Sequence, residues 1–116
     1  MYESIVVGVG GARYGLPMAK VVEVIGLSHT TPVPLGPRAL VGLMHLRGQI
    51  ILVVDLQSLL AKESIDRAIL PDEPLLVIRS AETLIGLRVD EVLGPVSDDN
   101  ATPVDIDALL VQLKQA

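Results

Sequence analysis

Glu23 and Arg47 are the charged side chains whose positions suggest a chemical role, because each interrupts a run of β-branched or aliphatic residues. The surrounding apolar runs predict that both residues lie at the same end of one sheet. One interpretation is a solvated surface ion pair, which contributes little to stability. The other is a docking surface, on which the planar guanidinium of Arg47 binds a partner or holds a loop for one. The residue types leave both alternatives equally open.

No set of residues in the sequence predicts catalysis. The chain has no Cys, which excludes disulfides and thiol chemistry, and no Ser-His-Asp or paired-acid arrangement stands out. His29 and His45 have no acid at ligand spacing, so a metal role is not predicted. Asp98, Asp99 and Asn100 fit a solvated turn better than a cation site. We therefore expect no metal, no cofactor and no enzymatic activity.

The glycine-rich stretch at residues 8–13, Gly-Val-Gly-Gly-Ala-Arg, has some likeness to a dinucleotide-binding turn. Arg13 stands where the third glycine of that motif belongs, and the residues that follow predict a strand instead of a helix. A hairpin turn is therefore the better interpretation of this stretch.

The composition predicts one small domain with an aliphatic core. The 116 residues are 50% hydrophobic, yet they include no Phe, no Trp and only two Tyr. The net charge of −5 argues against a nucleic-acid binder that follows phosphates. No uncharged apolar run is long enough to cross a membrane, and the N-terminus lacks the basic cluster of a signal peptide. We therefore expect a cytoplasmic protein without direct membrane contact.

The element that must position Arg47 is a central hairpin, predicted from two apolar runs that flank Arg47 and Gly48. Glycine supplies the positive φ that a tight turn requires, so residues 41–46 and 49–54 should pair in antiparallel fashion. Residues 50–54 are continuously apolar, which predicts a strand buried on both faces. Asp55 is predicted to end that strand and to accept backbone N–H groups of a short helix at 56–61.

The other apolar patterns predict strands at 4–9, 13–16 and 20–25, and a single helical turn at 37–40. They also predict a second hairpin, formed by strands at 75–80 and 84–89 and extended at 90–93. The tail carries the clearest helix signal, in which apolar residues recur with helical spacing at Ile106, Leu109, Leu110 and Leu113. Thr102 is predicted to cap this helix, with Pro103 at its first position.

Three pairs of segments repeat along the chain. Residues 14–16 and 22–26 match residues 85–87 and 90–94, and residues 53–60 match 103–110. The second copy is 18 residues shorter, in the region where the first copy has its central hairpin. These matches predict two related β subdomains, each closed by a helix, with the second one incomplete. An incomplete sheet leaves open edges, and we expect a strand near 84–93 to lack a neighbour.

Five segments, taken together and in order, resemble the CheW family of bacterial chemotaxis coupling proteins. They are residues 20–24, 32–34, 41–48, 53–56 and 86–93. The match extends over most of residues 3–97. His45 replaces the family's usual Asn before Leu-Arg-Gly, Leu52 replaces a usual Pro, and a segment after Gly94 is missing. The chain is thus similar to a short, divergent member of the family.

This resemblance implies an all-β fold of two SH3-like β-barrel subdomains, at about 14–60 and 75–113, with the strand at 4–9 packed at the seam. It implies an adaptor that binds the cytoplasmic tips of chemoreceptors in a groove between the barrels. Family members also bind a CheA-type histidine kinase at the ends of both barrels. The resemblance carries a protein-binding role to eight residues: Val21, Glu23, Gly42, Arg47, Gly48, Val89, Glu91 and Val92.

The missing segment places kinase binding in doubt. We expect an adaptor that binds receptor tips and modulates array assembly, with kinase binding weakened or lost. The alternatives are an ordinary coupler of receptor and kinase, and a small-molecule-binding β-barrel or enzyme with a site at the subdomain seam. The partners considered are the receptor tip, a CheA-type kinase and another CheW-like protein, with no nucleic acid.

Overall fold

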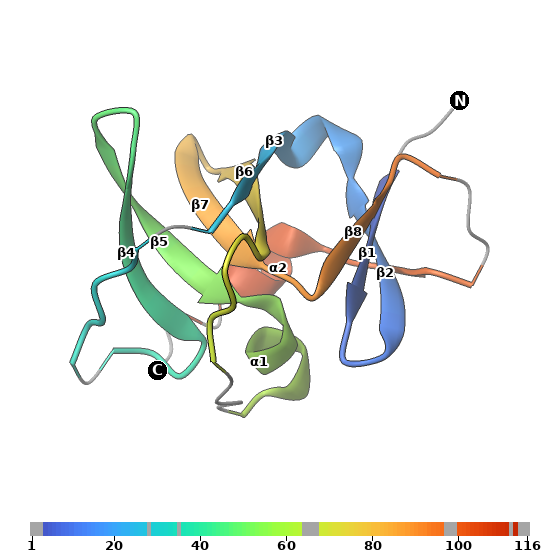
Figure 1. Ribbon diagram of the computed structural model, residues 1–116. Helices are drawn as coiled ribbons and strands as arrows, with labels where there is room; N and C mark the ends of the chain where they lie inside the picture. Colours follow the sequence, from blue (N-terminus) through green and yellow to red (C-terminus); the bar gives the residue numbers. More distant parts are fainter. Residues whose placement is uncertain are drawn as a thin grey trace.

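The computed structural model describes residues 4–27, 29–34, 36–63, 68–96, 100–111 and 113. The described chain folds into two twisted β-sheets with two short helices (Figure 1). The four-stranded sheet has the order β8-β1-β2-β9, and the five-stranded sheet has the order β3-β6-β7-β5-β4. The all-β prediction with short helices is therefore confirmed.

The five-stranded sheet contains the central hairpin and most of the predicted second hairpin. Its strands, in the order of the sheet, are β3 (Val21–Gly26), β6 (Pro74–Ser80), β7 (Thr83–Arg88), β5 (Gln49–Asp55) and β4 (Leu40–Leu46). All pairs are antiparallel except β5 and β7, which run parallel from Leu52 opposite Ile85 to Asp55 opposite Arg88.

The four-stranded sheet is built around the first hairpin of the chain. Its strands, in order, are β8 (Glu91–Gly94), β1 (Ser4–Val9), β2 (Ala12–Pro17) and β9 (Thr102–Pro103). Gly10 and Gly11 form the β1–β2 turn with φ of 57° and 82°, a conformation that costs glycine nothing. A strand follows this turn, so the hairpin interpretation of residues 8–13 is confirmed. A short 3₁₀ helix, η1 (Met18–Lys20), then leads into β3.

The sequence repeat corresponds to a structural repeat that relates the two sheets. Both copies cross between the sheets: the first passes from β2 to β3, and the second passes from β7 to β8. The strand before each helix also pairs in parallel with the equivalent neighbour, β5 with β7 and β9 with β2. Strands β8, β1, β2 and β9 therefore correspond to β3, β6, β7 and β5. Because each sheet takes strands from both halves, the limits 14–60 and 75–113 remain a prediction.

The repeat also shows where the smaller sheet is incomplete. β9 has two residues where β5 has seven, and the described residues contain no counterpart of β4. The expectation that a strand near 84–93 lacks its neighbour is wrong for β7, which lies between β6 and β5. β8 is an end strand, but so is its counterpart β3. The unfilled edge therefore lies beside β9, at the opposite side of the smaller sheet.

The larger sheet is closed toward a barrel by the segment that follows β3. Thr31 and Leu43 of β4 exchange two backbone hydrogen bonds, each of 2.8 Å. This contact requires glycine at position 42, because a Cβ there would lie 2.5 Å from the carbonyl oxygen of Thr31. This single bridge joins the segment that follows the end strand β3 to the other end strand, β4. An interior apolar cluster fills the resulting barrel and contains Leu27, Met44, Ile51, Val53 and Leu75.

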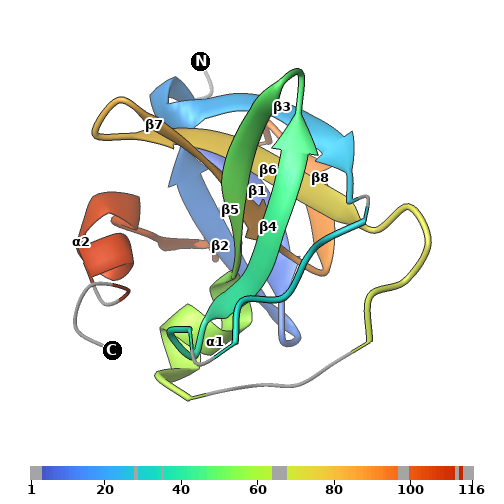
Figure 2. The ribbon, with the colours of Figure 1, turned by 90° about the vertical axis from the view of Figure 1, so that its left-hand side faces the viewer.

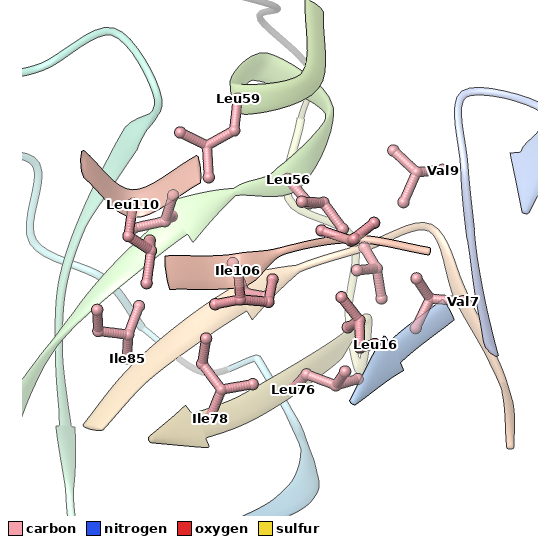
Figure 3. Close-up of a cluster of buried hydrophobic side chains, with 14 of the residues drawn as sticks. Val7, Val9, Leu16, Leu56, Leu59, Leu76, Ile78, Ile85, Ile106 and Leu110 are labelled. Atoms are coloured by element: carbon pink, nitrogen blue, oxygen red, sulfur yellow. The ribbon is translucent and has the colours of Figure 1, made fainter. Parts of the chain in front are cut away.

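A second, larger apolar cluster lies between the two sheets and under both helices (Figure 3). It takes side chains from every part of the chain, and its labelled members include Val7, Leu16, Leu56, Leu76 and Ile106. All of the fully buried large side chains are Leu, Ile or Val, as the composition predicted. This cluster packs the two sheets against each other, and Figure 2 shows the same ribbon turned by 90°.

The helices follow aspartates at equivalent positions in the repeat. α1 (Leu56–Ala61) follows Asp55, and α2 (Ile106–Leu110) follows Asp105. The Asp105 carboxylate accepts the Ala108 backbone N–H at 3.2 Å. The predicted cap at Thr102 is wrong, because Thr102 and Pro103 form β9 against Tyr14 and Gly15. The predicted apolar stripe is confirmed, since Ile106 and Leu110 are buried and the other two leucines pack against the same cluster.

Three local expectations for the first half are corrected. Asp55 is buried and accepts the Ser58 hydroxyl at 3.0 Å, and no backbone N–H caps onto its side chain. Residues 37–40 form a turn, closed by the Leu40 N–H to Pro37 carbonyl bond, that leads into β4. Ile50 is 62% exposed although the whole run was expected to be buried. The β5–β7 ladder begins at Leu52, so the hairpin extends past the sheet before that residue.

Candidate protein-docking face

Glu23 and Arg47 form an ion pair that links the two ends of the larger sheet. Glu23 lies on the end strand β3, and Arg47 lies in the turn between β4 and β5. Both terminal nitrogens of Arg47 donate to the carboxylate, one to each oxygen, which is the fork geometry that lysine cannot form. The hydrogen bond from Arg47 lowers the pKa of Glu23 below its ordinary value and raises that of Arg47. The ion pair of the first sequence-based interpretation is therefore present, and the docking role of Arg47 stays a prediction.

The turn that carries Arg47 is an unusual place for this residue. Arg47 has φ of 48° and Gly48 has φ of 80°, so both turn positions lie in the left-handed region. Two-residue turns of this kind favour Asn-Gly, since most side chains disfavour positive φ. The backbone therefore tolerates Arg47 instead of selecting it. Its side chain is 67% exposed, whereas that of Glu23 is 25% exposed, so the guanidinium remains accessible from solvent while it pairs.

Two valines of β3 that flank Glu23 in the sequence are exposed. Val22 is 48% exposed and Val24 is 46% exposed, while their neighbours on the strand are partly buried. A β-bulge between Val21 and Glu23 interrupts the β3–β6 ladder. The sequence showed the alternation along this strand but did not show which face solvent reaches. β3 therefore offers apolar side chains together with a neutralised charge pair.

The remaining predicted site residues occupy three environments. Val21 is partly buried and packs on the cluster between the sheets, Gly42 is buried beneath Thr31, and Gly48 is exposed in the turn. On the other sheet Val89 is fully buried at 0% exposure, Val92 is partly buried, and Glu91 is exposed on β8. Gly42 and Val89 thus position their neighbours and present no side chain at the surface.

Glu91 is the repeat counterpart of Glu23. Its side chain lies over Gly8, where a Cβ would come within 2.8 Å of the Glu91 Cγ. In the larger sheet, the partner of Glu23 comes from the turn between β4 and β5. The described part of the smaller sheet has no counterpart of β4, so it has no equivalent turn that could bring an arginine to Glu91. Figures 1 and 2 place β3 and β8 on the same side of the molecule. This side, defined by the exposed residues of β3 and β8, is called the docking face below.

A buried ion pair that the sequence did not predict lies at the start of β6. Arg88 donates through Nε and Nη2 to the two carboxylate oxygens of Glu73, the second bond measuring 3.1 Å, and the side chains are 4% and 7% exposed. Arg88 Nη2 also donates to the Ala68 carbonyl at 2.7 Å. The only sequence signal was a charged residue inside an apolar strand, because Glu73 lies 15 positions away.

No described residues form a group of three or more His, Cys, Asp or Glu that could hold a metal ion. Within the described parts of the chain, none of the helices has the length and apolar character needed to cross a membrane. The acidic residues Asp98 and Asp99 lie outside the described residues, so their predicted turn is untested. The docking face combines the exposed valines of β3 with the ion pair that Glu23 of the same strand forms with Arg47.

Two joined β-sheets, closed by short helices and carrying a charged pair at a barrel edge, define a small β-barrel scaffold domain. Residues 3–102 match the model of the CheW-like domain. The chain is similar to Protein FrzA of Myxococcus xanthus, with 34% identity over 104 residues that cover 86% of this chain and 64% of that protein. It is also similar to the scaffolding protein TtCheW of Thermoanaerobacter tengcongensis, with a TM-score of 0.71, 30% identity, and coverage of 86% and 68%.

The chain therefore belongs to the CheW-like domain family, a family of scaffolds in chemotaxis-type signalling. It spans 64% of the length of the curated relative that it matches. The resemblance drawn from the five sequence segments is confirmed.

Proposed function

We propose that this chain is a non-enzymatic adaptor that binds the cytoplasmic tips of chemoreceptors through its docking face and modulates the assembly of signalling arrays. The observation that carries the proposal is the forked ion pair of Arg47 with Glu23, which lies on the same end strand as the exposed Val22 and Val24. β3 is an end strand, so an amphipathic helix that lies along its edge can cover the valines with its apolar stripe and meet the Arg47 guanidinium with its polar flank.

The proposal also assigns weakened or absent binding to a CheA-type kinase. The smaller sheet lacks a counterpart of β4 in the described residues, and β9 has only two residues. If the kinase contacts the edge of the smaller sheet beside β9, this chain offers it too few strands. The docking face does not depend on that edge, because β8 lies at the opposite end of the smaller sheet from β9, and β3 belongs to the larger sheet.

A binding comparison with two separate partners tests the proposal. The chain is titrated by calorimetry with a chemoreceptor signalling tip and, under identical conditions, with the regulatory domain of a CheA-type kinase. We expect measurable receptor binding and no measurable kinase binding. Tight kinase binding would support the ordinary coupler, and binding of neither partner would contradict the adaptor assignment.

A further inference from the structure

The connector before β6 carries the most exposed large apolar side chain in the described residues. Leu70 is 63% exposed and its neighbour Ile69 is 42% exposed. Single exposed apolar residues are common on protein surfaces, but two adjacent ones followed by proline form a ridge. We call residues 69–71 the connector ridge.

The ridge is held in place by the buried ion pair. Arg88 binds the Ala68 carbonyl on one side of the ridge, and the Glu73 carboxylate accepts the Leu70 N–H at 2.9 Å. The Glu73 N–H donates back to the Leu70 carbonyl at 3.3 Å. The ridge is therefore fixed from both ends with its two apolar side chains exposed. A surface that is already ordered loses less conformational entropy when a partner binds.

The repeat does not require this ion pair. The position of Arg88 corresponds to Pro17 in the other copy, where β2 ends at the same register. The buried ion pair is thus found in one copy of the repeat, at the connector between α1 and β6. A specific role for the segment that they hold in place is the simplest reason for them.

The ridge borders a groove that begins where β3 ends. The Leu27 N–H binds the Glu73 carbonyl at 2.7 Å, and beyond this bond the two segments diverge. The space between them has a volume of about 440 Å³ and is lined by Leu27, His29, Thr30, Ile69, Leu70 and Pro71. None of these residues is an acid or a constitutively charged base, so the groove suits apolar side chains of a partner.

The groove adjoins the end of β3, because Leu27, which lines it, directly follows Gly26, the last residue of that strand. In Figures 1 and 2 the connector lies on the same side of the molecule as β3 and β8. From Val22 to Leu27 a strand extends roughly 17 Å, at about 3.3 Å per residue. A helix covers that length with about 11 residues, which is three turns. One amphipathic helix can therefore contact the exposed valines of β3 at one end and the connector ridge at the other.

We infer that the connector ridge is a second apolar contact for the receptor helix that the docking face binds. This inference rests on the proposed function, since it extends the same site and names the same partner. The receptor helix is expected to place one set of apolar residues on β3 and another set, two to three turns away, in the groove beside Leu70.

Matched surface variants test this inference. Leu70→Ser changes an exposed side chain of the ridge, and Val111→Ser changes a 48% exposed side chain at the end of α2, which Figure 2 places on the opposite side of the molecule. Binding of the receptor signalling tip is measured by calorimetry for both variants and for the unchanged protein. We expect about a tenfold loss of affinity for Leu70→Ser and less than a twofold change for Val111→Ser.

A photo-crosslinking residue at position 70 supplies an independent readout. We expect it to capture the receptor helix, whereas the same residue at position 111 does not. The control result is that the unchanged protein binds the receptor and that Val24→Ser weakens this binding. The inference is overturned if, in that case, Leu70→Ser leaves the affinity unchanged and the crosslinking residue at position 70 captures no receptor. Failure of the unchanged protein to bind the receptor overturns the proposed function itself, so the two failures are distinguishable.

Discussion

Arg47 occupies a backbone position that a different residue would fill more easily. Its left-handed conformation, with φ of 48°, is the one for which asparagine followed by glycine is favoured. Residues held in sparsely populated backbone regions often serve a function. The fork to Glu23 supplies that function locally by joining the hairpin tip to β3. Whether the pair also serves a partner is the question that the sequence left open.

The substitution Arg47→Asn separates the two roles of this residue. We expect it to preserve or raise thermal stability, because asparagine tolerates the turn better. We expect affinity for the receptor tip to fall at least about tenfold, equivalent to about 1.4 kcal/mol of binding free energy. Arg47→Lys is the control, since it keeps the charge and loses the fork. Unchanged affinity in both variants would reduce the ion pair to a surface feature.

The acidic partner makes stability depend on pH in a defined direction. The pKa of Glu23 is lower in the folded state than its ordinary value of 4.5, chiefly because Arg47 donates hydrogen bonds to it. The unfolded state thus binds more protons at acidic pH. The contribution of the pair to stability is present above about pH 4.5 and is lost as the pH falls through the folded value.

Urea unfolding of the unchanged protein and of Glu23→Gln measures this effect. We expect the difference in unfolding free energy to be largest near pH 7 and to shrink as the pH is lowered below 4.5. The Arg47→Gln background serves as the control, in which the same substitution should show no such pH dependence. A difference that grows toward acid would contradict the assigned direction.

At the scale of elements, the connector and β7 depend on each other through Arg88 and Glu73. Arg88→Met leaves a buried carboxylate without its guanidinium, which costs about 3–5 kcal/mol when one partner of a buried pair is removed. We expect the double variant Arg88→Met with Glu73→Leu to recover most of that stability, because replacing both charges by apolar side chains is often neutral. Thermal unfolding of the three proteins tests this. Equal stability for the single and the double variant would show that the charges do not compensate each other.

The tail helix is a structural element of the core. Ile106 is 2% exposed and Leu110 is 7% exposed, and burying two such side chains contributes about 3–6 kcal/mol. That is comparable to the whole stability margin of a small domain. We expect removal of residues 106–116 to leave an unfolded or aggregating protein by circular dichroism and light scattering. Val111→Ser, at an exposed position of the same tail, should remain folded.

The sequence predicted those elements whose signals are local. The three predicted hairpins needed only apolar runs around short turns, and α2 needed only the spacing of its leucines. The predicted cap at Thr102 failed because Thr102 pairs with Tyr14, 88 positions earlier, and no local pattern reports that pairing. The exposure of Ile50 depends on where β7 stops pairing with β5. The contact between Arg88 and Glu73 joins a strand to a connector, so sequence reasoning had no means of finding it.

At the scale of the whole molecule, the missing counterpart of β4 makes a prediction about partners. A loop and strand pair from a longer homologue, grafted between Gly94 and Pro103, should restore an edge to the smaller sheet beside β9. We expect this graft to add binding to the kinase regulatory domain and to leave receptor-tip affinity within twofold, as measured by calorimetry. A graft with its strand residues replaced by a Gly-Ser linker of equal length is the control. Kinase binding by the control would show that strand pairing is not the requirement.

Because each repeat crosses between the two sheets, the protein cannot complete either sheet early in its synthesis. When a ribosome has released residues up to the end of α1, the four-stranded sheet has only β1 and β2, and the five-stranded sheet lacks the strands that join β3 to β5. Neither sheet can be completed from the first half alone. Both partial sheets therefore keep unpaired strand edges until the second half emerges. During that time, the exposed valines and leucines of the first half are the side chains that a chaperone would bind first.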